Sequence, residues 1–372
     1  MSYKPRACCL IVFASFAVFF SGCTFLPIGK ARKRTAAQKN QPQANEPPSV
    51  DEQRRVRDSQ QAYAKLRKEP KALPQVPDIK GQTAEYATTV YSGVFYEALM
   101  NRDFELIDRA ADEARASKEK SVAGVWKLEY IYRGLDKPYA ATSDREWQRH
   151  LKLLKQWSKE RPDSRTAKIA LATSYFNFGW NARGHDYADK VSEENRKHFS
   201  ERVDQARNLL VSMRAENPHH VCPKWYSLML QIANCEGWPR KMYDDVFDYS
   251  VRYEPTWYEF YRQKAIYLLP KWNGEPGDLE AYANSYATRN DEDSARIYFL
   301  IMQCASAADK NERQKPLAHF AVFKQGFLDM QKTYGVTTLT TIIAFEKAAL
   351  ANDGAFAKEI SQLQGQANVA RK

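Results

Sequence analysis

Helical periodicity dominates the chain from Gln82 onward. Apolar residues recur at the spacing of one face of an α-helix, and the sustained alternation typical of half-buried strands is absent. These patterns predict an all-α fold. The clearest examples are Ala167, Ala170, Leu171, Ser174, Tyr175 and Phe178; Phe199, Val203, Ala206, Leu210 and Met213; Trp225, Leu228, Met229 and Ile232; and Ile297, Leu300, Ile301 and Cys304.

Helix breakers separate these segments and predict about a dozen helices joined by short turns. Helices with short connections pack antiparallel, as αα-hairpins. Pro218 and Pro255 lie 37 residues apart, and the same step reaches the acidic start of another helix at residues 290–293. The interval from Pro162 to Pro218 is longer, which predicts an insertion between Gly184 and Glu193.

A period in the thirties with two helices per unit resembles a tetratricopeptide array. The sequence therefore predicts a tetratricopeptide-like αα-hairpin solenoid over residues 81–365, followed by a short tail at residues 366–372. An irregular helical bundle is the alternative.

The N-terminal segment is a different kind of sequence. An apolar run from Leu10 to Phe20 follows Lys4 and Arg6, which is the pattern of a secretory signal. The continuation Ser21-Gly22-Cys23 resembles the lipobox of bacterial lipoproteins, in which the cysteine is diacylated and becomes the new N-terminus. We therefore expect residues 1–22 to be a signal peptide and Cys23 to be the lipidation site.

Two residues near Cys23 bear on the lipobox resemblance and on the membrane that would hold the anchor. Phe20 stands where the lipoprotein family prefers leucine. Thr24 stands where an aspartate often retains the protein at the inner membrane, so the resemblance implies an outer-membrane anchor that faces the periplasm. The alternative is an uncleaved inner-membrane helix from Cys8 to Ile28, which is long enough to span a bilayer. Basic residues at positions 30–34 favour this alternative, because positive flanks tend to stay cytoplasmic.

Residues 23–80 are predicted to be a flexible linker that starts at the lipidated cysteine. They are rich in proline and glutamine. A helix from Glu52 to Glu69 stays open, although its apolar residues are sparse. Residues 24–80 carry 13 basic and six acidic residues, so most of the net charge of +11 lies beside the anchor. The nearly neutral remainder argues against nucleic acid as a partner. The basic linker either contacts anionic lipid headgroups or is simply a solvated tether.

Three separated stretches resemble a bacterial family of unknown function with tetratricopeptide-like helices, over roughly residues 85–350. The resemblance implies a helical-repeat fold and no particular activity. The stretches are Trp126-Lys127-Leu128 with Tyr132 and Leu135; Tyr175 with Trp180-Asn181-Ala182-Arg183-Gly184; and Leu268-Leu269-Pro270-Lys271-Trp272-Asn273-Gly274 with Pro276-Gly277.

Trp180 and Arg183 are the most suggestive candidates for a site. Their spacing places them on one helix face, where a guanidinium can lie over an indole ring. Gly184 is then expected to end the helix. The motif is either a partner-binding patch or a structural cluster, and the same two interpretations apply to Trp126, Trp272 and Gly274.

No catalytic, metal or cofactor site is predicted. The sequence lacks the glycine-rich loops that bind nucleotides, and no carboxylate pair can be assigned to glycan cleavage. Acidic residues 291–293 are expected to open a helix, and Asp244, Asp245 and Asp248 to lie on a solvated face. His219, His220 and Cys222 share a turn without a second pair of ligands.

Processing at Cys23 would leave three cysteines, Cys222, Cys235 and Cys304. The first two are expected at opposite ends of one helix, about 20 Å apart, which is too far for a disulfide bond. Cys304 is predicted to be a buried thiol, and a pair with Cys235 stays open.

The expected function is therefore that of a lipid-anchored helical-repeat scaffold, which binds a protein or peptide partner in the cell envelope. The alternatives are a cell-wall-acting enzyme with an unrecognised site and a lipid-surface adaptor that uses the basic linker.

Overall fold

The protein is represented by a computed structural model that describes residues 49–69, 71–77, 83–138, 143–184, 191–216, 221–291 and 293–369. These residues form helices and no strand, apart from an isolated antiparallel bridge between Lys120 and Trp126, which confirms the all-α prediction. The helices are α2 (Val50–Leu66), α3 (Ala84–Met100), α4 (Phe104–Ser117), the 3₁₀ turn η2 (Val122–Gly124), α5 (Lys127–Leu135), α6 (Asp144–Glu160), α7 (Arg165–Arg183), α8 (Glu193–Glu216), α9 (Pro223–Cys235), α10 (Arg240–Tyr253), α11 (Glu259–Tyr267), α12 (Asp278–Ala287), α13 (Ser294–Ala308), α14 (Lys310–Arg313), α15 (Phe320–Tyr334), α16 (Thr338–Leu350) and α17 (Gly354–Val369).

Several helix starts follow from local capping chemistry. Ser143 and Glu146 form a reciprocal capping box at the start of α6. Ser164 and Thr337 accept backbone N–H groups at the starts of α7 and α16. These hydroxyls satisfy donors that a helix cannot pair internally, so the polar residues before each apolar run determine where the helix begins.

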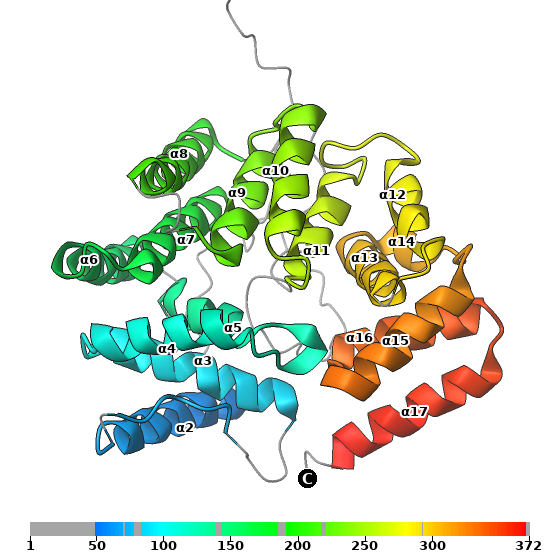
Figure 1. The fold of residues 1–372 in the computed structure, drawn as a ribbon, viewed down its shortest axis with the longest axis horizontal. Coiled ribbons are helices and arrows are strands. Elements are labelled where there is room, and N and C mark those ends of the chain that lie inside the picture. Colours follow the sequence, from blue (N-terminus) through cyan, green and yellow to red (C-terminus); the bar gives the residue numbers. More distant parts are fainter. Residues whose placement is uncertain are drawn as a thin grey trace, which may run out of the picture.

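The helices follow one another around an arc, with α2 and α17 at its two ends (Figure 1). Each hairpin packs its two helices together, and alternate helices also touch, so that α5, α7, α9, α11 and α13 form a continuous series of neighbours. Helices α9, α11 and α13 begin at Pro223, Glu259 and Ser294, which are 36 and 35 residues apart.

A strap of residues 118–126, between α4 and α5, connects distant parts of the arc. Lys118 pairs with Glu254 at 2.6 Å. The backbone N–H of Ala123 donates to the Gly335 carbonyl at 3.1 Å, and Lys120 lies over the ring of Tyr334. The strap therefore fastens the first half of the chain to the end of α15.

The predicted linker is wrong for residues 50–66, which form α2. This helix packs on α3: Tyr63 is buried, and the Ser59 hydroxyl donates to the Val90 carbonyl at 3.2 Å. The helix that stayed open for residues 52–69 therefore forms, because its few apolar residues share one face and polar contacts support them. At the other end α17 runs to Val369, into the predicted tail, and it buries Phe356 and Ile360.

The helical patterns identify most of the core correctly. Every residue of the α9 and α13 examples is buried, while Tyr175 and Phe199 are only partly covered. Aromatic side chains fill the space between helices, as in the stacked pair of Trp147 and Phe178 at 5.2 Å. None of the helices in the described part of the chain combines the length and apolar character needed to cross a bilayer.

Candidate functional site

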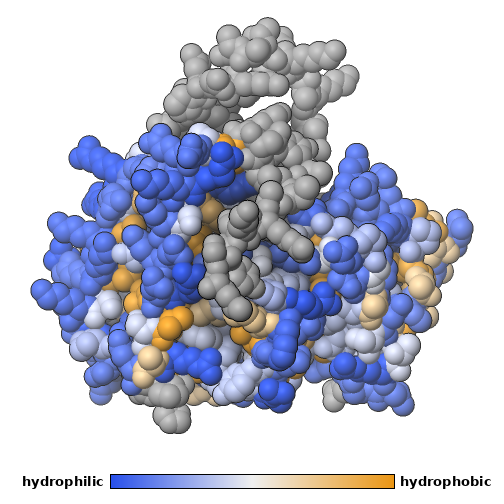
Figure 2. All heavy atoms as spheres, turned by 90° about the horizontal axis from the view of Figure 1, so that it is seen from above, coloured by the Kyte–Doolittle hydropathy of each residue, from blue (hydrophilic) through white to orange (hydrophobic). Residues whose placement is uncertain are grey.

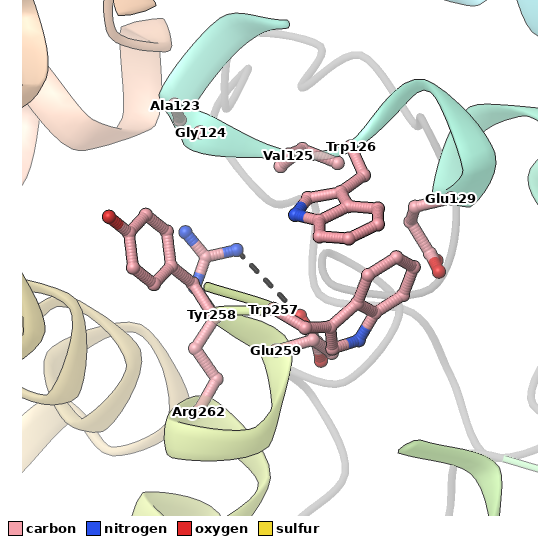
Figure 3. A pocket seen from close by; sticks show the side chains of 9 residues that line it. All are labelled: Ala123, Gly124, Val125, Trp126, Glu129, Trp257, Tyr258, Glu259 and Arg262. Atoms are coloured by element: carbon pink, nitrogen blue, oxygen red, sulfur yellow. Dashed lines mark ion pairs between the residues drawn. The ribbon is translucent and has the colours of Figure 1, made fainter. Parts of the chain in front are cut away.

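A pocket lies between the strap and the start of α11. The pocket is small and partly open: its cavity volume is about 20 Å³, and the space reaches about 280 Å³ only when the solvent at its mouth is included. Its lining comes from residues 123–126, Glu129, residues 257–259 and Arg262. Figure 3 shows the Arg262 guanidinium between the Tyr258 ring and the two indoles of Trp126 and Trp257.

The aromatic walls of the pocket are held by polar bonds to groups outside its lining. The Trp126 indole N–H donates to the Thr256 carbonyl at 3.1 Å, and the Tyr258 hydroxyl to Asp293 at 3.1 Å. Trp257 donates to the Ser227 hydroxyl at 2.7 Å. Because these polar atoms are already used, the rings present apolar surface to the pocket, and its polar chemistry comes from charged residues.

Six charged residues form a cluster at the pocket, and three of them, Glu129, Glu259 and Arg262, belong to its lining. In the first part of the cluster, Lys224 pairs with both carboxylate oxygens of Glu129 at 3.0 Å, and Arg133 lies 3.6 Å from one of them. The Lys224 side chain is only 7% exposed, so this pair is shielded from solvent. Burying this ion pair removes two charges from water, which costs free energy. The pair is therefore evidence of a polar interior rather than of a gain in folding stability. The cluster comprises Glu129, Arg133, Asp136, Lys224, Glu259 and Arg262.

Glu259 and Arg262 are paired less closely. Arg262 Nη1 lies 3.8 Å from Glu259 Oε2, and Arg262 Nε has no hydrogen-bond partner among the described residues. The other Glu259 oxygen accepts a hydrogen bond from Gln263 at 2.7 Å. Burial raises the pKa of Glu259, against the opposing effect of Arg262. Among the described residues, the pocket therefore contains a buried cation with one unpaired N–H and one long ion-pair contact.

Asp136 caps the C-terminal end of α5 and is 5% exposed. One of its carboxylate oxygens has no hydrogen-bond partner in the described part of the chain. Burial raises the pKa of Asp136 to about 7, although Lys137 and Lys224 act in the opposite direction. A negative charge at a helix C-terminus is also opposed by the helix dipole. The charge cluster thus holds a carboxyl group that is partly protonated near neutral pH.

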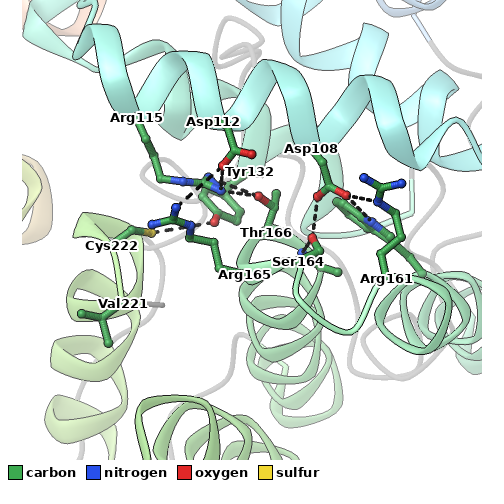
Figure 4. A network of polar contacts seen from close by, with 12 residues as sticks. Asp108, Asp112, Arg115, Tyr132, Arg161, Ser164, Arg165, Thr166, Val221 and Cys222 are labelled. Atoms are coloured by element: carbon green, nitrogen blue, oxygen red, sulfur yellow. Dashed lines mark hydrogen bonds and ion pairs between the residues drawn. The ribbon is translucent and has the colours of Figure 1, made fainter. Parts of the chain in front are cut away.

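A second polar network, drawn in Figure 4, connects α4 to the turn before α7. Asp108 accepts hydrogen bonds from Arg161 and Ser164, both at 2.5 Å, and from the Trp157 indole. Nearby, Arg115 donates to the Thr166 hydroxyl at 2.6 Å. Apart from Arg115 Nε, these groups are paired with one another, which is the pattern of a structural network.

The structure places Trp180 and Arg183 as their spacing predicts. The Arg183 guanidinium lies 5.4 Å from the centre of the Trp180 ring, which also packs edge-on against Phe199 at 4.7 Å. Gly184 ends α7 with a φ of 74°, a conformation that favours glycine. Of the predicted insertion, residues 185–190 lie outside the described residues.

Trp272 and Gly274 belong to a tight turn after α11. A side-chain carbon on Gly274 would lie 2.0 Å from the Leu268 carbonyl oxygen, so the turn requires glycine. Asn273, between them, donates to the Asn234 backbone and side chain at 2.9 and 2.8 Å. The turn is therefore fastened to the C-terminal end of α9.

These candidates occupy different places. Trp126 alone lines the pocket. The Arg183 guanidinium lies near the Cys235 thiol, where it opposes the increase in pKa that burial causes. Since Cys235 follows Asn234, the Trp180 and Trp272 motifs both adjoin the end of α9 rather than the pocket. Whether they bind a partner stays a prediction.

We expect Arg183→Ala to lower stability by less than about 1 kcal/mol, because it removes a partly exposed cation–π contact. Trp180→Ala should cost roughly 2–4 kcal/mol, because a packed ring is lost. Urea unfolding of both variants tests this order. A loss from Arg183→Ala as large as that from Trp180→Ala would contradict the packing explanation.

The structure also bears on the predictions made for the cysteines. Cys222 and Cys235 flank α9, and Cys304 is fully buried; all three are free thiols, so the open 235–304 pair is not formed. No group of potential metal ligands occurs among the described residues. His219 and His220 lie outside them, as do Cys23 and the predicted signal peptide.

Sequence reasoning missed the charge cluster. Glu129 and Lys224 are 95 residues apart, and no local motif joins them. A usable signal existed in α9, where Lys224 is the single charged residue in an otherwise uncharged, mostly apolar helix.

The comparisons with known proteins add no identity. No protein-family model, curated protein or solved structure matches the chain.

Proposed function

We propose that this protein is a lipid-anchored helical scaffold of the cell envelope, which binds a protein or peptide partner in the pocket under the strap. The observation that carries the proposal is Arg262, a buried cation in an aromatic-walled pocket whose Nε has no hydrogen-bond partner among the described residues. Buried polar groups are normally paired, so an unpaired one in a pocket indicates a ligand.

The arrangement of the helices supports a scaffold. Alternate helices touch along the arc, as neighbouring repeats of a tetratricopeptide-like solenoid do, and such arrays present concave binding surfaces. The face seen in Figure 2 is mostly hydrophilic with small scattered hydrophobic areas. The described residues on this face therefore show no broad apolar area of the kind that marks a docking surface.

The anchor and its location rest on the sequence. The resemblance of Ser21-Gly22-Cys23 to a lipobox supports lipidation at Cys23 and an outer-membrane position facing the periplasm. Intact mass of detergent-extracted protein tests the anchor. A mass that starts at Cys23 and includes the acyl chains is expected, whereas an unprocessed, unmodified chain would instead support an inner-membrane helix.

Site-specific crosslinking in intact cells tests the pocket. A photoreactive residue at Val125, in the pocket lining, should crosslink to a discrete partner. The same group at Val211, which is 54% exposed on α8, is the control for random encounters. Equal products from both positions, or none from Val125, would contradict a partner site in the pocket.

One observation favours a second function, a hydrolase acting on the cell wall. Glu259 lines the pocket and has a raised pKa, a property that general acids share. Turnover of cell-wall glycan or peptide by wild-type protein, lost in Glu259→Gln, would support this function over that of a scaffold.

A further inference from the structure

Arg262 differs from the other well-buried arginines in how it is paired. It is 9% exposed, yet its shortest ion-pair distance is 3.8 Å. Arg296, on the adjacent α13, also has an unpaired Nε, but its Nη1 pairs with Asp293 at 3.0 Å, and Arg202 donates to the Phe178 carbonyl at 2.9 Å. A guanidinium carries five N–H donors and gains most from a bidentate acceptor. Arg262 has no such acceptor among the described residues.

The surroundings of Arg262 provide few competing partners. Glu129 is neutralised by Lys224 and Arg133, and one Glu259 oxygen is already bonded to Gln263. The polar atoms of the aromatic walls are bonded elsewhere. An anion that enters the pocket therefore has to displace only the long contact between Arg262 and Glu259.

The charges nearby limit what kind of anion fits. Glu259 lines the pocket and, unlike Glu129, has no close neutralising pair among the described residues, so it would repel a doubly charged group such as a phosphate more strongly than a singly charged one. A carboxylate carries one charge, and its two oxygens match the planar fork of a guanidinium. The aromatic walls can cover the apolar carbon atoms next to it.

We infer that Arg262 binds a carboxylate of the partner, supplied either by the C-terminus of a peptide or by an acidic side chain. This inference rests on the proposed function, since it names the chemical group that the pocket receives. Arg262 is the residue that recognises the partner's carboxylate. When no partner is bound, the guanidinium of Arg262 contacts Glu259 instead.

The test uses the indole N–H signals of Trp126 and Trp257, which line the pocket and report on its contents. Full-length, isotope-labelled protein in detergent micelles is titrated with acetate and, as the uncharged counterpart, with acetamide. The two indole signals are assigned from Trp126→Phe and Trp257→Phe. We expect acetate to shift both signals in a saturable manner and acetamide to leave them unchanged.

Two substitutions are expected to change the affinity for acetate in opposite directions. Arg262→Gln should weaken acetate binding at least about tenfold, because the charge-assisted bonds are lost. Glu259→Gln should strengthen binding by about threefold or more, because the competing carboxylate is gone. Arg202→Gln is the matched control: its side chain is similarly buried, on α8, and the change should leave binding unaltered.

Peptide probes distinguish the two sources of the carboxylate. Trialanine with a free C-terminus is compared with its amide and with Ala-Asp-Ala amide. Binding of the free C-terminus alone assigns a terminal carboxylate, and binding of the aspartyl amide assigns an acidic side chain.

The inference is overturned if acetamide shifts the signals as acetate does, or if acetate has no effect on either wild-type protein or Glu259→Gln. The second comparison holds even if Arg262→Gln fails to fold. Crosslinking from Val125 without any carboxylate binding would retain the scaffold function and reject only the role of Arg262.

Discussion

At pH 8 the Asp136→Asn variant should be more stable than the wild-type protein, by roughly 2–4 kcal/mol. Burial raises the pKa of Asp136 from 3.8 to about 7, so the folded protein holds a proton that the unfolded chain releases between these values. Stability contributed by this group is present below pH 4 and is lost as the pH rises toward 7 and above. Asparagine resembles the protonated form and removes the loss.

His150 gives folding stability the opposite dependence on pH. It is 1% exposed, its Nε2 lies 2.9 Å from the Leu135 carbonyl oxygen, and burial lowers its pKa from 6.5 to about 4. The unfolded chain takes up a proton below pH 6.5 that folded His150 refuses, so stability falls as the pH falls toward 4. Between pH 4 and 6.5 the effects of Asp136 and His150 therefore offset each other in the wild-type protein.

In the Asp136→Asn variant, the effect of His150 on the pH dependence of stability should become measurable. The stability of this variant is expected to drop by about 3 kcal/mol between pH 6.5 and 4, while that of wild type changes little. Urea unfolding followed by circular dichroism across this range measures both. Asp245→Asn, at an exposed residue of α10, controls for a general change in charge. Parallel curves for wild type and Asp136→Asn would mean that Asp136 titrates normally.

The Gly274→Ala variant should lose about 3–5 kcal/mol of stability, near the upper end for single substitutions. The added carbon would meet the Leu268 carbonyl oxygen at 2.0 Å and its carbon at 2.3 Å. These are backbone atoms, so the turn has to open, which endangers the bonds from Asn273 to Asn234.

Gly184→Ala provides the matched control at the end of another helix. Its φ of 74° strains an alanine, but no atom lies within 4 Å of the added carbon. We expect a cost of roughly 1–3 kcal/mol from backbone strain alone, because φ of 74° with ψ of −171° is a conformation almost restricted to glycine. Equal losses in the two variants, measured by thermal unfolding, would show that close approach at Gly274 is not the cause.

Local patterns predicted the helices but not the site. The stripes of α9 and α13 determine which faces are buried, because each is contained within one helix. The packing of helix α2 could not be predicted because it depends on α3, about 30 residues away, as in the Ser59 to Val90 hydrogen bond. The charge cluster combines residues from α5, α9 and α11, and its pairing becomes visible only after the chain has folded. Trp126 was selected for its resemblance to a family motif, although its place in the pocket depends on Trp257.

The strap also has a consequence for how the molecule unfolds. In an open array of repeats, each unit contacts only its neighbours, and the ends can fray independently. Here the hydrogen bond from Ala123 to Gly335 spans more than half of the chain. Detaching α15 breaks contacts with the first half as well, so loss of the C-terminal helices is coupled to the strap that covers Arg262. The pocket therefore sits where the two halves cooperate, and a ligand held there would slow amide exchange in segments that it never touches.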